Sequence, residues 1–462
     1  MCNNKSIRPG ANLLPVFFTA GLVLLSIIGV ARLYSLGAAA LASATVPERL
    51  AMSRCVDYAS TDYASNLRTD PGSIFGSIST LDGRLLYDAT HSRQTPAFAG
   101  LIGSMQFEDT RYVSDRYQKQ LFSAHYTPFR GFVADKQADL VLTLNASVHE
   151  DLFSFLTEHN VKGSVFAYNY DSGDICCMVS TPGAALDDGN AEAGSWLNKC
   201  LYNTTPGSTM KLVLCYLLEM QGVRPEELIF HCEGRYHLKH AGECVNCTGT
   251  HGAIDGVTAL GVSCNCYFAQ AAELLDPEQV KADLEALGFQ VNQTKGAQLG
   301  SLPRSSSVVQ LSGVWDFNSV FGLIGQNETL VSPIDMATLA GQYATGGTAA
   351  APRLVVGECP ESKALAQEQI QAFADGGDLW RRASELHRPK GFSELITAAK
   401  TGTCDELGKD GNRTQKLLCG YSEQLHTAFY IVVENHRAEG TTLDVTAAEI
   451  ANRLLTSIQS AG

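Results

Sequence analysis

The sequence predicts an α+β protein in which helices flank an antiparallel sheet and a helical subdomain is inserted between its strands. The order of elements predicts this class, because a hairpin comes early, a mostly helical block follows, and strands return before a closing helix at 445–459. The composition agrees, since 45% of the 462 residues are hydrophobic and 18% are charged, as in an ordinary folded protein.

The first half of the chain supplies two hairpins, a strand and a helix. Residues 76–88 read as strand, Asp-Gly turn and strand, and residues 139–145 read as a further strand. Residues 147–160 place their large apolar side chains on one helix face. Two apolar runs within 163–180, separated by 171–174, predict the second hairpin.

The second half begins with helices and ends with strands. Residues 276–289 start at Asp-Pro and predict a helix, as do residues 332–347, with Ser332 as the N-cap. The apolar runs at 394–403 and 426–435 predict strands. These strands and the hairpin of the first half are expected to share one sheet.

One segment near the N-terminus predicts a membrane anchor. Residues 13–31 carry no charge and are long enough to cross a bilayer. Lys5 and Arg8 precede this segment, which favours a cytoplasmic N-terminus. A cleaved signal peptide is the alternative, because residues 38–44 contain small residues in A-x-A spacing. The length of the run and the charge of Arg32 favour an uncleaved anchor.

Charge and cysteine content limit the possible partners and ligands. The formal net charge of −14 argues against a nucleic-acid-binding protein, which needs a basic face. Fourteen cysteines are many for an exported chain. One cluster has C-x-x-C spacing with histidines nearby, and its members are Cys232, His237, His240, Cys244, Cys247 and His251. A zinc knuckle needs a second such pair, so a local disulfide or free thiols are favoured over zinc.

Ser208 and Lys211 form the first candidate catalytic motif, S-x-x-K. Their i,i+3 spacing stacks both side chains on one helix face, where a lysine can take the proton of a serine hydroxyl. Pro206 and Gly207 suit a tight entry into that helix, and its N-terminal dipoles favour a developing alkoxide. The pattern alone is weak, because a serine N-cap followed by lysine also arises by chance.

Ser263 and Asn265 form the second candidate motif, S-x-N, with Cys264 between them. The hydroxyl can relay a proton to a leaving group, and the amide can orient Lys211 and a substrate carbonyl. The alternative is structural, with Ser263 as a simple N-cap of the following helix.

Residues 400–403, with the sequence Lys-Thr-Gly-Thr, form the third candidate motif at the end of a predicted strand. Alternation places Lys400 and Gly402 on one face and Thr401 and Thr403 on the other. A glycine allows a substrate backbone to approach, and a following N–H can donate to an oxyanion. The alternative is an exposed basic strand end.

Each motif occurs once, and their order, S-x-x-K, S-x-N and K-T-G, is typical of penicillin-binding proteins and serine β-lactamases. The blocks at 139–152, 163–183 and 325–347 also resemble the corresponding family blocks in sequence. The chain therefore resembles the transpeptidase domain of class B penicillin-binding proteins over roughly residues 139–460. One departure is Asn327, which stands where the family more usually has a glycine.

The resemblance implies the fold shared by serine β-lactamases and penicillin-binding transpeptidases. This fold has an antiparallel sheet flanked by helices and an all-helical subdomain, here behind an N-terminal transmembrane helix. It divides the chain into a cytoplasmic tail (1–12), a transmembrane anchor (13–33), a juxtamembrane pedestal (34–138) and a transpeptidase domain (139–462). The catalytic domain is then expected outside the cytoplasm, attached to the cell membrane by one span.

The resemblance also implies a role for each catalytic residue. Ser208 is expected to be the acylated nucleophile and Lys211 its general base. Ser263 is expected to pass the proton toward the leaving D-alanine, while Asn265 positions the donor peptide.

The third motif is expected to bind substrate. Lys400, Thr401 and Thr403 would bind the terminal carboxylate of a stem peptide or of a β-lactam. Gly402 would stay small to admit the substrate strand, and the N–H groups of Ser208 and Thr403 would form the oxyanion hole.

The implied activity is peptidoglycan D,D-transpeptidation, in which stem peptides are crosslinked through an acyl-enzyme that β-lactams also form. No metal or cofactor is expected. A membrane glycosyltransferase of the shape or division machinery is the expected protein partner.

Two other functions remain open at the level of sequence. The first is hydrolysis, by a D,D-carboxypeptidase or a β-lactamase-like enzyme. Against it, no E-x-x-L-N loop lies between the second and third motifs, and class D β-lactamases carry Val or Ile at the position of Asn265. The second is a non-catalytic scaffold for wall synthesis that has kept the fold.

Overall fold

The computed structural model describes residues 26, 30–32, 76–87, 95–103, 111–121, 124–127, 131–134, 139–184, 191–239, 241–360, 364–406, 413–438 and 441–462. The predicted tail 1–12 and nearly all of the predicted anchor 13–33 lie outside these residues. Among the described residues, no helix has the length and hydropathy needed to cross a membrane.

The chain forms two compact units. The first contains residues 1–76, 105–108 and 119–138, and the second contains residues 77–104, 109–118 and 139–462. In the first unit, β3 (Ala124–Thr127) pairs with β4 (Gly131–Ala134) as an antiparallel hairpin.

The second unit is built around a six-stranded sheet with the order β16-β17-β18-β6-β7, in which β19 pairs with β18. Every pair in this sheet is antiparallel. Its strands are β6 (Gly163–Asn169), β7 (Ile175–Thr181), β16 (Ala398–Glu406), β17 (Arg413–Ser422), β18 (Thr427–Ala438) and β19 (Thr441–Thr442). The prediction that the early hairpin and the late strands share one antiparallel sheet is therefore confirmed, although β17 was not predicted.

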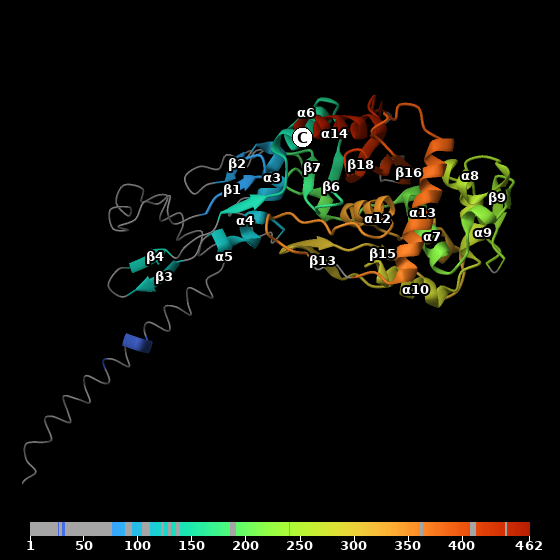
Figure 1. Cartoon of the computed structure of the whole chain (residues 1–462), viewed down its shortest axis with the longest axis horizontal. Helices are drawn as coiled ribbons and strands as arrows, with labels where there is room; N and C mark the ends of the chain where they lie inside the picture. The colour runs from blue at the N-terminus through green and yellow to red at the C-terminus, as the bar shows by residue number, and fades with distance from the viewer. Residues whose placement is uncertain are drawn as a thin grey trace, which may run out of the picture. The chain divides into compact units, whose positions relative to one another are not determined.

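Two helices cover one face of this sheet. They are α6 (Ala146–Glu158) and α14 (Ala447–Ala461), which pack against each other in Figure 1. Leu152 of α6 and Leu454 of α14 are fully buried in a core that also contains Phe429 and Ile431 of β18. Burial of this apolar surface fixes the helices on the sheet.

The opposite face is covered by α12 (Pro333–Thr345), which contacts β17, β18 and β6. α12 ends at Gly346, which has the left-handed φ of 61° that favours glycine at this position. Ser332 is the N-cap residue as predicted, but its hydroxyl makes no capping bond and instead accepts a hydrogen bond from Arg304.

Further helices form a subdomain, which contacts α12 through α13 (Gln367–Leu386). It also contains α7 (Met210–Met220), α8 (Gly256–Gly261), α9 (Asn265–Ala272), α10 (Pro277–Ala286) and α11 (Phe317–Leu323). Figure 1 shows α8 and α9 on the side of α7 and α13 away from β6 and β7.

The prediction that this subdomain is all-helical was wrong. Between α7 and α12 the chain also forms four two-stranded sheets. Their strands are β8 (Phe230–Cys232), β9 (Arg235–His237), β10 (Cys244–Asn246), β11 (Gly252–Ile254), β12 (Gln290–Val291), β13 (Gly296–Leu299), β14 (Leu302–Ser305) and β15 (Val308–Val309). Glycines explain the first two sheets, because Gly234, Gly242 and Gly252 have positive φ and interrupt any helix.

A smaller three-stranded sheet completes the second unit. β1 (Ile78–Thr80) pairs with β2 (Leu85–Tyr87) as the predicted hairpin and runs parallel to β5 (Leu140–Leu142). The helices α3 (Pro96–Ile102) and α4 (Val113–Arg116) lie in the same unit. Part of the predicted pedestal segment thus shares a compact unit with the predicted transpeptidase domain.

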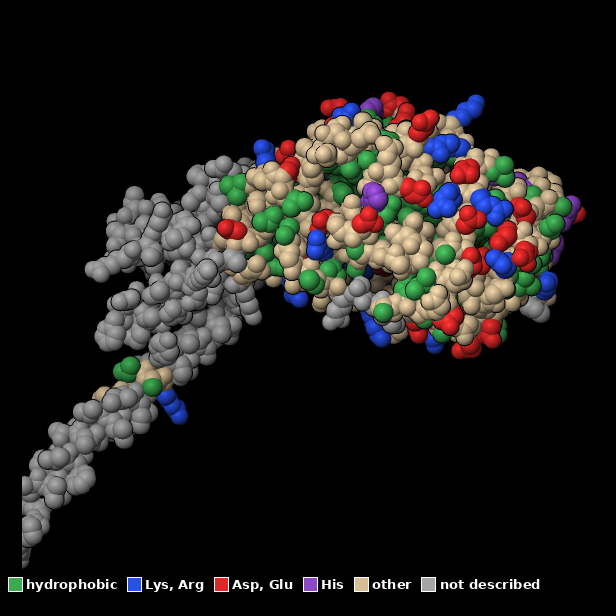
Figure 2. All heavy atoms as spheres, viewed as in Figure 1, with side chains coloured by type: hydrophobic (Ala, Val, Ile, Leu, Met, Phe, Trp, Pro, Cys, Tyr) green, Lys and Arg blue, Asp and Glu red, His purple; other side chains and the backbone are tan. Residues whose placement is uncertain are grey.

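Acidic and basic side chains are interspersed on the face of the molecule shown in Figure 2. That face of the described residues therefore carries no continuous basic surface of the kind that binds nucleic acid.

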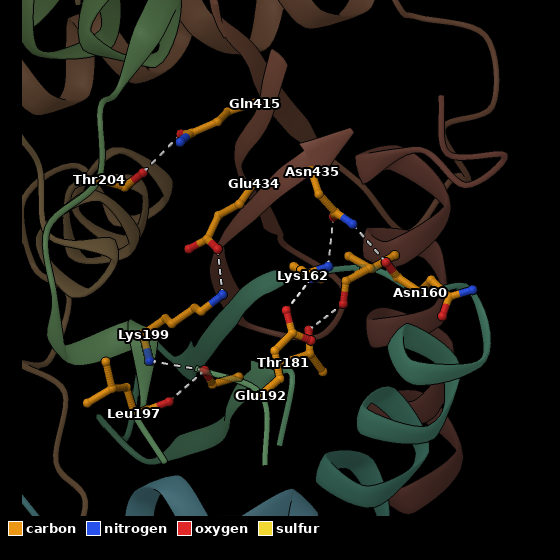
Figure 3. A network of polar contacts seen from close by, with 12 residues as sticks. Asn160, Lys162, Thr181, Glu192, Leu197, Lys199, Thr204, Gln415, Glu434 and Asn435 are labelled. Carbon is orange, nitrogen blue, oxygen red and sulfur yellow. Dashed lines mark hydrogen bonds and ion pairs between the residues drawn. The ribbon is translucent and has the colours of Figure 1, made fainter. Parts of the chain in front are cut away.

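A polar network ties the segment before the first motif to the end of the sheet (Figure 3). Lys199 forms an ion pair with Glu434 of β18, and Lys162 forms one with Glu192. The side chain of Asn435 accepts a hydrogen bond from the Lys162 N–H at 2.8 Å. These contacts fix the segment 191–201, which leads into the Ser208 turn, against β18 and the start of β6.

Candidate active site

Ser208 lies in a single 3-10 turn, η3 (Gly207–Thr209), that runs directly into α7. Gly207 has a φ of +50°, and a Cβ added there would lie 2.8 Å from the carbonyl oxygen of Thr403 on β16. Only glycine fits this backbone conformation and this close approach without strain. The turn is therefore held against β16 with the half-buried Ser208 at its centre.

Lys211 is fully buried one helical turn later, and its Nζ lies among three oxygen-bearing residues. Nζ is 3.0 Å from Ser208 Oγ, 2.7 Å from the Ser263 carbonyl oxygen and 2.6 Å from Asn265 Oδ1. The two carbonyl oxygens can only accept hydrogen bonds. A neutral amine that donates to both can direct its lone pair at Ser208 Oγ, which is the arrangement a general base requires.

Burial also prepares Lys211 for this chemistry. Because the side chain is removed from water, the charged form is disfavoured and the pKa of Lys211 falls to about 8. The neutral amine is therefore accessible near physiological pH.

Ser263 joins the first and third motifs. Its Oγ is 3.2 Å from Lys211 Nζ and 3.0 Å from Lys400 Nζ, so one hydroxyl contacts both lysines. Its φ of +59° is uncommon for a residue other than glycine. The alternative reading of Ser263 as an N-cap was wrong, because Cys264 caps α9 by accepting from the Tyr267 N–H.

Asn265 is oriented by contacts at both ends of its amide. Its Nδ2 donates to the carbonyl oxygen of Asn246 at 2.9 Å, which leaves Oδ1 to accept from Lys211. The amide thus contacts Lys211 directly, which is the contact that the predicted orienting role requires.

The third motif lies on β16, where burial alternates as predicted. Lys400 and Gly402 are buried, whereas Thr401 and Thr403 are exposed. Lys400 Nζ donates to Ser263 Oγ at 3.0 Å and to the Thr401 carbonyl oxygen at 2.8 Å. Burial and the neighbouring Lys211 hold the pKa of Lys400 well below its usual value.

Gly402 has a structural reason to be small. A Cβ at this position would lie 2.8 Å from the carbonyl oxygen of Pro206 and 3.1 Å from a methyl carbon of Thr209. The close neighbours of Gly402 are therefore Pro206 and Thr209 beside Ser208 and Leu417 of β17, and the role of Gly402 in admitting a substrate strand stays a prediction.

Lys416 is a residue near the site that the sequence interpretation missed. β17 places Lys416 opposite Thr403, and Lys416 Nζ donates to Thr403 Oγ1 at 3.0 Å. No local motif marks this lysine, and only the strand register, which sequence patterns did not provide, brings it to the third motif.

Gly325 packs closely against the backbone of the Ser208 turn. It has a φ of +93°, and an added Cβ would lie 1.7 Å from the carbonyl oxygen of Gly207. Two residues later, Asn327 adopts a φ of +59°. Asparagine tolerates this left-handed conformation better than most residues, which explains how it stands in the place of a glycine.

All three motifs therefore meet at one place, and the fold and the site together define the class that contains penicillin-binding proteins and serine β-lactamases. Within this class, residues 163–456 match the family described as penicillin binding protein transpeptidase domain. Because the match covers more than half of the 462 residues, the chain belongs to this family.

Individual relatives are distant in sequence. Peptidoglycan D,D-transpeptidase PbpA of Mycolicibacterium smegmatis is 25% identical over 288 residues, which cover 55% of this chain and 57% of that protein. The chain thus spans little more than half the length of this relative.

Solved structures share the fold. The crystal structure of PBPA from Mycobacterium tuberculosis has a TM-score of 0.67 at 18% identity, covering 83% of this chain and 99% of that chain. The penicillin G acyl-enzyme complex of penicillin-binding protein A from the same organism gives the same values. These likenesses extend the family match to the three-dimensional fold.

Proposed function

We propose that this protein is a peptidoglycan D,D-transpeptidase that crosslinks stem peptides through an acyl-enzyme at Ser208. The observation that carries the proposal is the environment of Lys211, whose Nζ lies 3.0 Å from Ser208 Oγ and is held by two carbonyl acceptors. Membership of the transpeptidase family and the name of the mycobacterial relative support the same activity.

In the first half-reaction, neutral Lys211 removes the proton of Ser208 Oγ, which attacks the carbonyl carbon between the two D-alanines of a stem peptide. The N–H groups of Ser208 and Thr403 are proposed to stabilise the oxyanion. Ser263, between Lys211 and Lys400, relays the proton to the leaving D-alanine nitrogen as the C–N bond breaks. The product is a serine ester and free D-alanine.

In the second half-reaction, an amine from a neighbouring stem attacks the ester and restores Ser208. The proton of the amine returns to the serine through the same lysine. A β-lactam enters the same path, but its opened ring stays attached to the ester and the enzyme remains acylated. The M. tuberculosis relative forms such an acyl-enzyme with penicillin G.

Substrate binding is assigned to the third motif. Lys400, Thr401 and Thr403 are proposed to bind the terminal carboxylate, with Asn265 positioning the donor peptide. Support comes from the exposure of both threonines at the edge where Lys400 reaches Ser263. Lys416, which contacts Thr403, places a further lysine at this edge.

The site is proposed to lie outside the cytoplasm, behind a membrane anchor at 13–33 that follows a cytoplasmic tail at 1–12. The uncharged run at 13–31 supports this placement. A membrane glycosyltransferase of the shape or division machinery remains the proposed partner, and crosslinking followed by co-purification tests it. Failure to recover any such enzyme would remove this part of the proposal.

Labelling with a fluorescent penicillin tests the activity and separates its alternatives. We expect stable labelling of the native chain, none of Ser208→Ala, and little loss of label during a chase. Rapid loss would identify a hydrolase of the carboxypeptidase or β-lactamase kind. Absence of label in both proteins would support the non-catalytic scaffold.

A further inference from the structure

Four potential metal ligands gather beside the second motif, on a different set of residues from the site described above. They are Cys232, Cys247, His251 and Cys264, and their ligand atoms all lie within 4.8 Å of one another. They come from the end of β8, the loop after β10, the residue before β11 and the N-cap of α9. Three segments of the subdomain, namely β8, the loop between β10 and β11, and the start of α9, therefore converge on one point.

The distances within this group fit a tetrahedral zinc site. Cys247 Sγ is 3.8 Å from Cys264 Sγ, and His251 Nδ1 is 3.5 Å from Cys232 Sγ and 3.6 Å from Cys247 Sγ. Zinc bonds of about 2.3 Å to sulfur and 2.0 Å to nitrogen place two sulfurs about 3.8 Å apart and a sulfur and a nitrogen about 3.5 Å apart. A disulfide needs a sulfur–sulfur distance of only about 2.05 Å.

Backbone donors already serve two of the sulfurs. The Asn265 N–H donates to Cys247 Sγ at 3.3 Å, and the Tyr267 N–H donates to Cys264 Sγ at 3.3 Å. Hydrogen bonds of this kind orient and stabilise metal-bound thiolates. The Cys247 N–H in turn donates to the Gly234 carbonyl oxygen at 2.8 Å, which holds the ligand loop against the β8–β9 turn.

We propose that Cys232, Cys247, His251 and Cys264 bind one zinc ion that fixes the second motif in place. Three thiolates and one imidazole are a common closed ligand set for structural zinc. Zinc displaces the thiol protons to solvent and changes no oxidation state. The sequence interpretation had favoured a disulfide or free thiols, because the cluster contains one C-x-x-C pair, Cys244 and Cys247, where a zinc knuckle needs two.

His237 and Cys244, which belong to the cysteine and histidine cluster of the sequence, are not members of this group of four ligands. Cys244 Sγ contacts His237 Nδ1 at 2.9 Å on the β9–β10 hairpin. His240 lies outside the described residues. Cys244 therefore offers a matched control, since it is a nearby cysteine that is no member of the group of four.

The metal would act on the catalytic site through the backbone. Cys264 lies between Ser263 and Asn265, and the Asn265 N–H is bonded to Cys247 Sγ. Loss of the metal is therefore expected to loosen the amide that orients Lys211. This link rests on the proposed function, whereas metal binding itself does not.

Metal analysis of the full chain, purified in the presence of zinc, tests the site. We expect about one zinc ion per chain in the native protein and in Ser208→Ala, because the serine is no ligand. Cys244→Ser should keep the zinc, whereas Cys232→Ser should lose it. Removal of zinc from the native chain by a chelator should lower Tm, and the same treatment should leave Tm of Cys232→Ser unchanged.

A cobalt titration of the metal-stripped native chain avoids dependence on the folding of the variants. Tetrahedral cobalt bound to thiolates should give a charge-transfer band together with visible d–d bands. A native chain that binds neither metal would overturn the proposal, as would a Cys247–Cys264 disulfide found by peptide mapping. If the chain binds zinc but is not labelled by penicillin, the metal site is supported and only the proposed function is contradicted.

Discussion

Lys211 is the residue on which the chemistry of the site depends. Its buried Nζ contacts Ser208 Oγ, and Ser263 and Asn265 hold it through carbonyl oxygens. Burial favours the neutral amine, and the acceptors determine where the lone pair points. Lys211 thus combines a lowered pKa with a lone pair that is held toward Ser208 Oγ.

The rate of β-lactam acylation should therefore depend on the protonation of Lys211. Its pKa is lowered from 10.5 to about 8, so the neutral, reactive form increases as pH rises through that value. Below pH 7 the rate constant should rise about tenfold per pH unit, and it should level off above about pH 8. Stopped-flow acylation between pH 5.5 and 9.5 measures this profile, and a flat profile would exclude Lys211 as the base.

Ser263→Ala should slow acylation without preventing folding. The substitution removes the hydroxyl that contacts both Lys211 and Lys400, and so removes the proposed proton relay. We expect the acylation rate constant to fall by about 100-fold or more. Ser384→Ala is the matched control, because its hydroxyl bonds only to the backbone of Ala399 beside the third motif. Equal rates in the two variants would contradict the relay.

At the scale of elements, the site depends on close approaches between backbones. Gly207 and Gly402 pack the Ser208 turn against β16, and Gly325 packs against the Gly207 carbonyl oxygen of the same turn. These contacts leave no space for a Cβ, so the geometry of the nucleophile is set by three separate segments.

Gly325→Ala should displace Ser208 indirectly, through the backbone of the neighbouring Gly207. The added Cβ would lie 1.7 Å from the Gly207 carbonyl oxygen, at a φ of +93° that alanine rarely adopts. Displacement of the turn should lower the acylation rate constant by about 100-fold. Asn327→Gly should leave the rate unchanged, because glycine readily adopts the φ of +59° found there. A native rate in Gly325→Ala would show that the turn is not held in this way.

Sequence patterns predicted some elements of the sheet and its covering helices and missed others. The helix α6 and the hairpin of β6 and β7 were predicted from their patterns and lie where they were expected. β17 was missed because its apolar run, Leu417 to Cys419, has only three residues before Gly420, which is too short to predict a buried strand.

α13 was missed for a different reason. Gly376 and Gly377 disfavour a helix on intrinsic propensity, yet both pack tightly against Tyr343 of α12. The residues of the three motifs were found because their order is diagnostic as a set. Lys416 and the group of Cys232, Cys247, His251 and Cys264 depend on strand register and loop closure, which local patterns do not contain.

At the scale of the second compact unit, stability and catalysis rest on different faces of the sheet. α6 and α14 bury an apolar core on one face, whereas the Ser208 turn packs against β16 and β17 and its Thr209 contacts Tyr430 on the other face. Substitutions in the α14 core are therefore expected to change the free energy of unfolding and to leave the site intact.

Leu454→Ala should destabilise the protein by about 2–5 kcal/mol, because it leaves a cavity in a fully buried core. Below its melting temperature the variant should still be acylated at the native rate. Thr456→Ala, an exposed change on the same helix, is the control and should shift stability little. Denaturant unfolding and penicillin labelling of the same samples measure both quantities. A loss below 1 kcal/mol would argue against the packing of α14 described here.

The most direct test of the account is mass spectrometry of the full chain after treatment with penicillin G. The account predicts a mass increase of one intact penicillin per chain, located by peptide mapping to Ser208 and absent from Ser208→Ala. An adduct on any other residue, or an adduct that persists in Ser208→Ala, would contradict the assignment of Ser208 as the nucleophile.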